Sequence, residues 1–243
     1  TNRNYTGDTV ISHGVNVIPM KIAITRLENK AAGDRALCAS YGHDCYTVSP
    51  LRAELRMERV AAFVDAVHHS EFDCLFFTSA LPAGVVAPRL KRWPRVIAIG
   101  PKTAEILRES GIDAEVLPSF YSRDFVPYLG DWLRGRMVGI PRADVPNPGL
   151  LDGIVAAGGK YHEERIYALV PTGADLALGA ADAVLFTSAM SYREARWHPR
   201  VDLLLVAIGE ITAGAMRAGG HPPAVVGDGS LAGTLEALNR EGV

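Results

Sequence analysis

Cysteine is scarce in this chain of 243 residues. Its three cysteines, Cys38, Cys45 and Cys74, are odd in number and include no CxxC pair. Such usage does not support a disulfide framework or a thiolate zinc site. The sequence therefore predicts reduced, partly buried thiols in a cytoplasmic protein.

Long apolar runs and blocks of positive charge are also missing. The longest nearly apolar stretch, VDLLLVAIG at 201–209, is far shorter than the roughly 20 residues that span a bilayer. The formal net charge is −2, whereas proteins that bind nucleic acid or membrane surfaces usually carry a basic face. We therefore expect a small-molecule ligand and neither a nucleic-acid nor a membrane partner.

Several common catalytic patterns are absent. The seven histidines lack the spacing of metal ligands, and neither GxGxxG nor GxxxxGK[ST] occurs. The chain also offers no paired carboxylates or Ser/His/Asp arrangement typical of hydrolytic sites. We expect no metal site.

What the sequence does contain is an internal repeat. AIGPKTAEIL begins at Ala98 and AIGEITAGAM at Ala207, while LFFTSAL begins at Leu75 and VLFTSAM at Val184. Both pairs have the same separation along the chain. Two matched pairs at one separation indicate a duplicated unit.

Short apolar runs bounded by Gly or Pro alternate with segments of helical periodicity. The expected strands are 21–26, 73–79, 96–100, 114–119, 137–142, 182–188, 203–209 and 223–227, and helices are expected at 33–41, 102–110, 122–133 and 147–159, the last with Asn147 as its cap. This alternation predicts an α/β protein with parallel sheets in two similar halves.

Three further segments differ from this pattern. Residues 44–51 and 164–171 alternate apolar and polar residues and are expected to connect two lobes. Residues 1–19 lack the apolar core of a signal peptide and are expected to form an extension outside the core.

Taken in order, these motifs resemble the uroporphyrinogen-III synthase (HemD-like) family. A strand ending in Arg, FTS and IGxxTA is followed by a second strand ending in Arg, a Tyr in an extended segment, and FTS and IGxxTA again. The resemblance covers residues 20–238. It implies two parallel-sheet α/β lobes joined by a two-stranded connector, with the active-site cleft between the lobes. Lobe 1 would comprise 20–43 and 172–243, lobe 2 would comprise 51–161, and the connector strands would be 44–50 and 162–171.

The resemblance also implies a reaction. The family's substrate, hydroxymethylbilane, is a linear tetrapyrrole with eight carboxylates. It loses water, inverts its last pyrrole ring and closes to uroporphyrinogen III. The implied protein is a cofactor-free lyase of porphyrin and heme biosynthesis, expected to be a monomer. Uncatalysed closure gives the uninverted isomer, so the enzyme chiefly controls geometry.

Binding so many carboxylates favours free backbone N–H groups at helix N-termini, where parallel strands end. Hydroxyl groups in these turns are further candidates, and helix capping is an alternative use that is compatible with binding. The candidate hydroxyls belong to Thr78, Ser79, Thr103, Thr187, Ser188 and Thr212.

Three cations are candidates for binding carboxylates. Arg26 and Arg142 end equivalent strands, and a guanidinium group binds a carboxylate through two donors. Lys102 lies in the first IGxxTA turn, where the second turn has Ile211. Ion pairs at the surface are the alternative role for the arginines. Glu210, in the second turn, is expected to point away from a polyanion.

Tyr167 matches a tyrosine that the family carries in the connector, near the departing hydroxyl. A phenol can donate a hydrogen bond or a proton to a leaving hydroxide. Packing at a lobe junction is the alternative for Tyr167. We expect only a modest catalytic contribution, because the pyrroles of the bilane themselves expel the hydroxide.

Two other functions are alternatives. A non-catalytic two-lobed module that binds tetrapyrroles or small anions could share this fold, but both TS turns, both IGxxTA turns and Tyr167 are retained. A two-lobed sensor of the periplasmic-binding type would need larger lobes and a signal peptide.

Overall fold

The structure is a computed structural model that describes all residues except 1–16, 28–30, 32, 120 and 242–243. Most of the expected extension 1–19 therefore lies outside the described residues. The chain divides into two compact units, which are treated separately below. Unit 1 takes the described residues of Thr1–Leu51 and Pro171–Val243, and unit 2 is Arg52–Val170.

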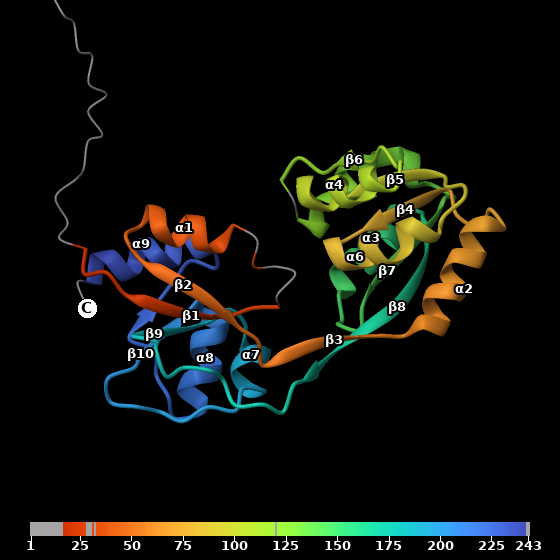
Figure 1. Ribbon diagram of the computed structural model, residues 1–243. Coiled ribbons are helices and arrows are strands. Elements are labelled where there is room, and N and C mark those ends of the chain that lie inside the picture. The colour runs from red at the N-terminus through yellow and green to blue at the C-terminus, as the bar shows by residue number, and fades with distance from the viewer. Residues whose placement is uncertain (1–16, 28–30, 32, 120, 242–243) are drawn as a thin grey trace, which may run out of the picture. The chain divides into compact units, whose positions relative to one another are not determined.

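Unit 1 is a parallel sheet covered by helices on both faces. Its described strands are ordered β11-β10-β9-β1-β2. Helices α1 and α9 cover one face of the sheet, and α7 and α8 cover the other (Figure 1). Their apolar residues pack against the strands on those faces. The strands are β1 (Lys21–Thr25), β2 (Asp44–Val48), β9 (Ala183–Phe186), β10 (Leu204–Ala207) and β11 (Val225–Val226), and the helices are α1 (Asp34–Ser40), α7 (Ala189–Arg193), α8 (Glu210–Ala218) and α9 (Leu231–Glu241).

Unit 2 has a second sheet, ordered β3-β8-β7-β4-β5-β6 in the described residues. Residues of α2, α3 and α4 pack on one face, and residues of α5 and α6 on the other. The strands are β3 (Leu51–Leu55), β4 (Cys74–Phe77), β5 (Arg95–Ala98), β6 (Glu115–Val116), β7 (Met137–Ala143) and β8 (Lys160–Pro171). The helices are α2 (Met57–His68), α3 (Ala80–Val86), α4 (Pro101–Glu109), α5 (Phe125–Leu129) and α6 (Pro148–Ala156), and the 3-10 turns are η2 (Ala87–Arg89), η3 (Ser122–Asp124) and η4 (Gly130–Leu133).

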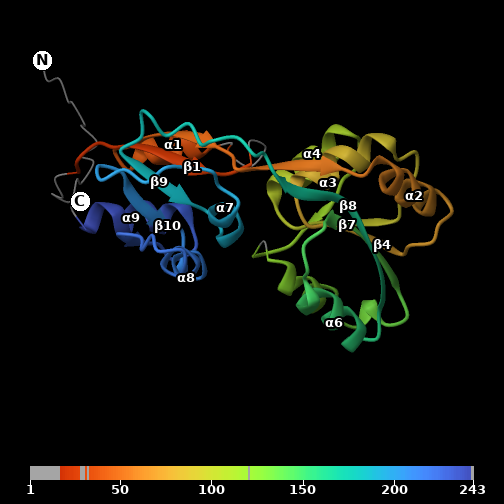
Figure 2. The same cartoon turned by 90° about the horizontal axis from the view of Figure 1, so that it is seen from below.

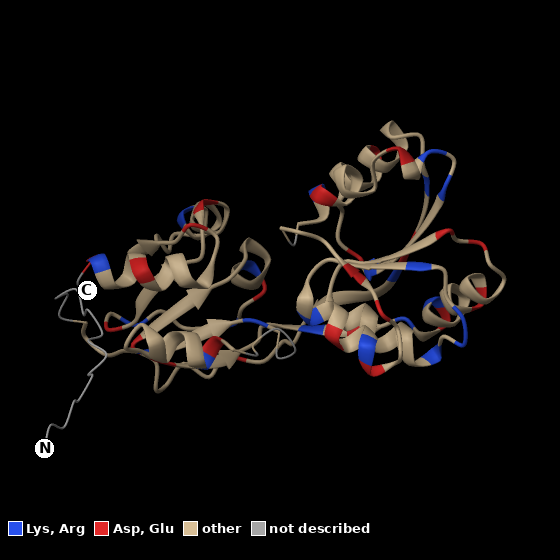
Figure 3. Cartoon of the chain, turned by 90° about the horizontal axis from the view of Figure 1, so that it is seen from above, with Lys and Arg blue, Asp and Glu red and all other residues tan. Residues whose placement is uncertain are grey.

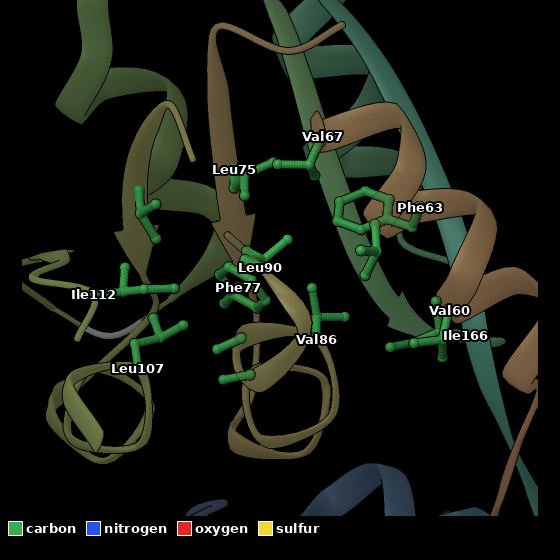
Figure 4. Packing of buried hydrophobic residues seen from close by; sticks show 14 of the residues in the cluster. Val60, Phe63, Val67, Leu75, Phe77, Val86, Leu90, Leu107, Ile112 and Ile166 are labelled. Carbon is green, nitrogen blue, oxygen red and sulfur yellow. The ribbon is translucent and has the colours of Figure 1, made fainter. Parts of the chain in front are cut away.

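The larger core of unit 2 lies between α2, α3, α4 and the sheet (Figure 4). Phe63 of α2 is fully buried there, and its ring stacks on that of Phe72 at 5.3 Å between centroids. Four consecutive residues of β4 are buried, which explains its apolar run: a parallel strand covered on both faces has no polar side.

The predicted α/β class with parallel sheets is confirmed. In the first sheet, the pairings among β1, β2, β9, β10 and β11 are parallel. In the second sheet, the pairings β8–β7, β7–β4, β4–β5 and β5–β6 are parallel. Each sheet also combines strands from both halves of the sequence repeat. β1 pairs with β9, and β7 pairs with β4.

Two local expectations differ from the structure. Residues 44–50 were expected to form a connector, but β2 pairs with β1 from Asp44 to Val48. β2 is the edge strand of the sheet, and its two buried apolar residues, Cys45 and Val48, pack on opposite faces. The expected helix 122–133 is broken into η3, α5 and η4, and α5 contains Pro127, which cannot donate a helical hydrogen bond.

No helix in the described part of the chain combines the length and hydropathy needed to cross a membrane. Charged residues of both signs are interspersed in each unit (Figure 3). Cys38, Cys45 and Cys74 are buried free thiols, and burial raises the pKa of Cys74 to about 12.

Candidate functional site

Four strand-to-helix turns have the same backbone geometry. Their N-cap residues are Ser79, Gly100, Ser188 and Gly209, with φ between −163° and −174° and ψ between 157° and 177°. Each follows the carboxyl end of a parallel strand, as Figure 2 lets the reader trace from β9 into α7 and from β10 into α8. The sequence repeat is therefore a structural repeat of one turn, twice in each unit.

Gly209, at one of these turns, lies close to another part of the backbone, so a larger residue there needs that backbone to move by a few tenths of an ångström. A Cβ on Gly209 would lie 3.3 Å from the backbone nitrogen of Gly229 and 3.4 Å from its Cα. The helix that begins there, α8, has no side-chain cap, nor has α4 after Gly100. First-turn N–H groups of α8 are thus left for water or a ligand. In α4, Pro101 has no N–H and the Thr103 N–H donates to the Gly100 carbonyl, which leaves the N–H of Lys102.

The hydroxyls of the turn in unit 1 are used within the protein. Ser188 and Ser191 form a capping box, in which the Ser191 N–H donates to Ser188 Oγ over 2.9 Å. The Thr187 hydroxyl donates to the carbonyl of Thr25, and the Thr187 N–H donates to the Thr25 hydroxyl over 3.1 Å. Capping and strand tethering therefore account for both hydroxyls.

The matching turn of unit 2 differs. Ser79 is the N-cap of α3 but makes no side-chain cap, and Thr78, like Ser79, is half-buried. Within the described residues, neither hydroxyl has an assigned hydrogen bond. This turn thus keeps its hydroxyl groups available, unlike its counterpart in unit 1.

The two threonines of the IGxxTA turns are buried on the inner face of their helices. Thr103 and Thr212 are both 3% exposed. Their positions in α4 and α8 place them against the sheet, so their hydroxyls do not lie on the open side of the turn. Lys102, by contrast, is exposed on α4, and within the described residues it has no ion-pair partner.

Arg26 follows β1 and is held by unit 1 itself. Its guanidinium group donates to Asp34 Oδ1 over 2.9 Å, and its N–H donates to the Val48 carbonyl. Glu210 pairs with Arg217 of the same helix, α8. This pairing gives Glu210 a partner along its own helix.

Arg142, at the end of β7, belongs to a chain of ion pairs. It donates to Glu163 over 2.9 Å, with the two side chains 9% and 10% exposed. Glu163 also accepts from Arg165, at 3.0 Å, and Arg165 reaches Asp144 at 2.9 Å. Arg56 completes the chain with a 2.6 Å contact to Asp144. Three guanidinium groups thus share two carboxylates.

This chain of ion pairs shifts the titration of its members. Hydrogen bonds from Arg56 and then Arg165 hold the pKa of Asp144 below its usual range. Hydrogen bonds to Glu163 and Asp144 raise the pKa of Arg165. Of these five residues, only Arg142 was a predicted site residue. The available signal was the EER run at 163–165 on the strand beside β7.

Tyr167 lies in β8 opposite Ala143, just after an irregularity in the β7–β8 pairing. It is 4% exposed and belongs to the apolar cluster with Val60, Phe63 and Ile166. Its carbonyl accepts from the N–H of Asp144 over 2.7 Å. Among the described residues its hydroxyl has no assigned hydrogen bond, although buried tyrosine hydroxyls usually find a partner.

Asn147, expected to cap α6, does occupy the N-cap position without a side-chain cap. Its side-chain amide instead donates to Ser122 Oγ over 3.2 Å. The described residues contain no group of three or more His, Cys, Asp or Glu side chains that could hold a metal ion.

Comparison with known proteins gives a family and a fold. The family model described as uroporphyrinogen-III synthase HemD matches residues 34–233. Comparison with curated proteins finds no match. The solved uroporphyrinogen-III synthetase of Helicobacter pylori is similar at a TM-score of 0.61 and 16% identity, covering 91% of this chain and 99% of that one. A mutant uroporphyrinogen III synthase from Thermus thermophilus is similar at a TM-score of 0.49 and 19% identity, covering 91% of this chain and 98% of that one.

Proposed function

The chain belongs to the uroporphyrinogen-III synthase family, and from this premise we propose how its residues serve the reaction. It is an enzyme of tetrapyrrole biosynthesis that converts hydroxymethylbilane to uroporphyrinogen III. The observation that carries this conclusion is the family match over residues 34–233, which includes all four strand-to-helix turns.

The proposed binding sites for the substrate's carboxylates are the strand-end turns. The uncapped N–H groups at the start of α8 and the Lys102 N–H at the start of α4 suit anions, because the helix dipole adds a partial positive charge there. In unit 2, the hydroxyls of Thr78 and Ser79 and the ammonium group of Lys102 add further donors.

The remaining candidates have weaker support as direct ligands. Thr187 and Ser188 are engaged within unit 1, so they are proposed to fix the shape of their turn. Thr103 and Thr212 are buried and are proposed to set the orientation of α4 and α8. Arg26 and Arg142 each have a carboxylate partner, so a substrate carboxylate would share or displace Asp34 or Glu163.

Tyr167 is proposed to donate a hydrogen bond to the departing hydroxide. Electrons from the pyrrole that bears the hydroxymethyl group expel hydroxide, and the carbon it leaves then bonds to the substituted α-carbon of the last ring. The earlier bond from that α-carbon to its methylene bridge breaks, and the bridge bonds to the other α-carbon of the ring, which loses a proton. This lost proton balances the one that converts hydroxide to water. A phenol that has no assigned acceptor among the described residues supports this role. Burial in an apolar cluster supports packing as the alternative.

The proposed reaction class is a cyclising lyase that needs no cofactor, since water loss and ring closure require no electron acceptor. We propose that the enzyme acts as a cytoplasmic monomer on this small molecule, without nucleic acid. Three free thiols suit a reducing compartment, and a formal net charge of −2 suits no polyanionic polymer.

The test supplies the protein with freshly generated hydroxymethylbilane. The products are oxidised to porphyrins and their isomers are separated by chromatography. The proposal predicts mainly the type III isomer. An isomer mixture identical to that of a reaction without protein would refute the enzyme and favour a binding module of the same fold.

A further inference from the structure

Unit 1 exposes two large apolar side chains at the carboxyl edge of its sheet. Met190 is 37% exposed and Ile211 is 87% exposed. Each stands at the second helical position after an N-cap, in α7 and α8 respectively. Single exposed apolar residues are ordinary, but these two repeat one position in two adjacent turns.

The two side chains belong to neighbouring elements. β9 and β10 pair in parallel, with Phe186 opposite Ala207, so α7 and α8 start at the same level of the sheet. Residues of both helices, including Tyr192 and Met216, pack into one apolar cluster on the same face. Met190 and Ile211 therefore lie at the same edge of unit 1, beside the uncapped start of α8.

The charge available at this edge differs between unit 1 and unit 2. Within the described part of unit 1, Arg26 is paired with Asp34 and Arg217 is paired with Glu210. The position that Ile211 holds in α8 is held in α4 of unit 2 by the exposed Lys102. Unit 2 thus offers an ammonium group where unit 1 offers a branched alkyl group.

We propose that Met190 and Ile211 contact the faces of the substrate's pyrrole rings, a role that rests on the proposed function. Each ring of a bilane has apolar faces next to its carboxylate-bearing side chains. At unit 1, backbone N–H groups of α8 bind a carboxylate while Ile211 covers the ring beside it. At unit 2, Lys102 binds a carboxylate through its charge.

The experiment compares Ile211→Ser and Met190→Ser with a matched control. Val201→Ser removes an apolar side chain that is fully exposed in the same unit but lies before β10, at the opposite end of that strand. Initial rates with hydroxymethylbilane give KM and kcat for each variant, and thermal melting gives its stability.

Ile211→Ser should raise KM about tenfold, equivalent to about 1.4 kcal/mol, because roughly half of an isoleucine side chain leaves water on binding. Met190→Ser should raise KM about threefold. Neither should change kcat, since ring contacts of this kind are made equally in the ground and transition states. Val201→Ser should keep the wild-type KM within a factor of two.

The dependence of KM on ionic strength distinguishes an apolar contact from an interaction between charges. Raising ionic strength should raise the wild-type KM because carboxylate binding is screened, while the tenfold ratio between Ile211→Ser and wild type should persist. An Ile211→Ser enzyme with the KM of Val201→Ser would overturn the inference. So would a lowered melting temperature at unchanged KM, which would assign Ile211 to packing. Absence of type III product from the wild type would instead refute the proposed function.

Discussion

Replacing Glu163 by Gln should destabilise unit 2 more than any other conservative change in its chain of ion pairs. Glu163 accepts hydrogen bonds from Arg142 and Arg165. Arg165 keeps Asp144 as a second partner. Arg142 is 7% exposed overall, and Glu163 is its one ion-pair partner among the described residues. Glu163→Gln therefore leaves a buried guanidinium group without a counter-charge.

The magnitude follows from burial. Removing one partner of a buried ion pair costs about 3–5 kcal/mol, and a glutamine oxygen still accepts one hydrogen bond, so we expect about 3 kcal/mol. At about 4 °C per kcal/mol for a domain of this size, the melting temperature of unit 2 should fall by about 12 °C. Asp144→Asn is the control, because its side chain is 30% exposed and its arginines 32% and 39%. Pairs this exposed contribute about 1 kcal/mol or less.

Scanning calorimetry of the purified variants measures both effects. A double variant, Glu163→Gln with Arg142→Met, should recover most of the loss, because it removes the stranded charge and keeps an apolar stem in its place. Equal losses for Glu163→Gln and Asp144→Asn would refute the reasoning, as would a double variant less stable than Glu163→Gln alone.

Three further perturbations probe other parts of the chain. Tyr167→Phe should lower kcat about tenfold, the effect of about 1.4 kcal/mol of lost transition-state hydrogen bonding, with an unchanged melting temperature; Tyr161→Phe, on the exposed end of β8, is the control, and equal rates would assign Tyr167 to packing. Gly227→Ala should cost more than about 2 kcal/mol, because its Cβ would lie 2.8 Å from the Ile208 carbonyl oxygen; a urea titration matching wild type would contradict the clash. Arg95 lowers the pKa of Glu115, so stability should be full above about pH 4.3 and fall as the pH drops through that lowered pKa. Acid titration of Glu115→Gln should show a smaller loss, and an identical profile would exclude this carboxylate.

Local sequence signals predicted the repeated turns well, because each combines an apolar strand end, a small N-cap residue and a helix of clear periodicity. All four N-caps adopt one conformation. The engagement of their hydroxyls could not be predicted. Ser188 forms a capping box because Ser191 follows three positions later, whereas the third residue after Ser79 is Pro82, which has neither an N–H nor a hydroxyl.

Non-local pairing explains the other differences. The segment 44–50 has the same alternating pattern in a connector or an edge strand, and only pairing with β1 decides between them. The chain of ion pairs around Glu163 draws on α2's N-cap, β7 and β8, whose residues are far apart in sequence. Nothing in the local pattern around Arg142 reveals that its charge is already matched within the protein.

The order of strands has a consequence for synthesis on the ribosome. Unit 2 is one continuous segment, and all its strands can pair once residue 171 has emerged. β1 and β2 are made first, but β1 lies beside β9, some 160 residues later. In a nascent chain, β1 and β2 therefore expose an apolar edge that has no partner strand until β9 is made, while unit 2 completes its folding. Slower translation after residue 171 would lengthen the time for which this edge is exposed. A chaperone that binds exposed strands would prevent most aggregation during that time.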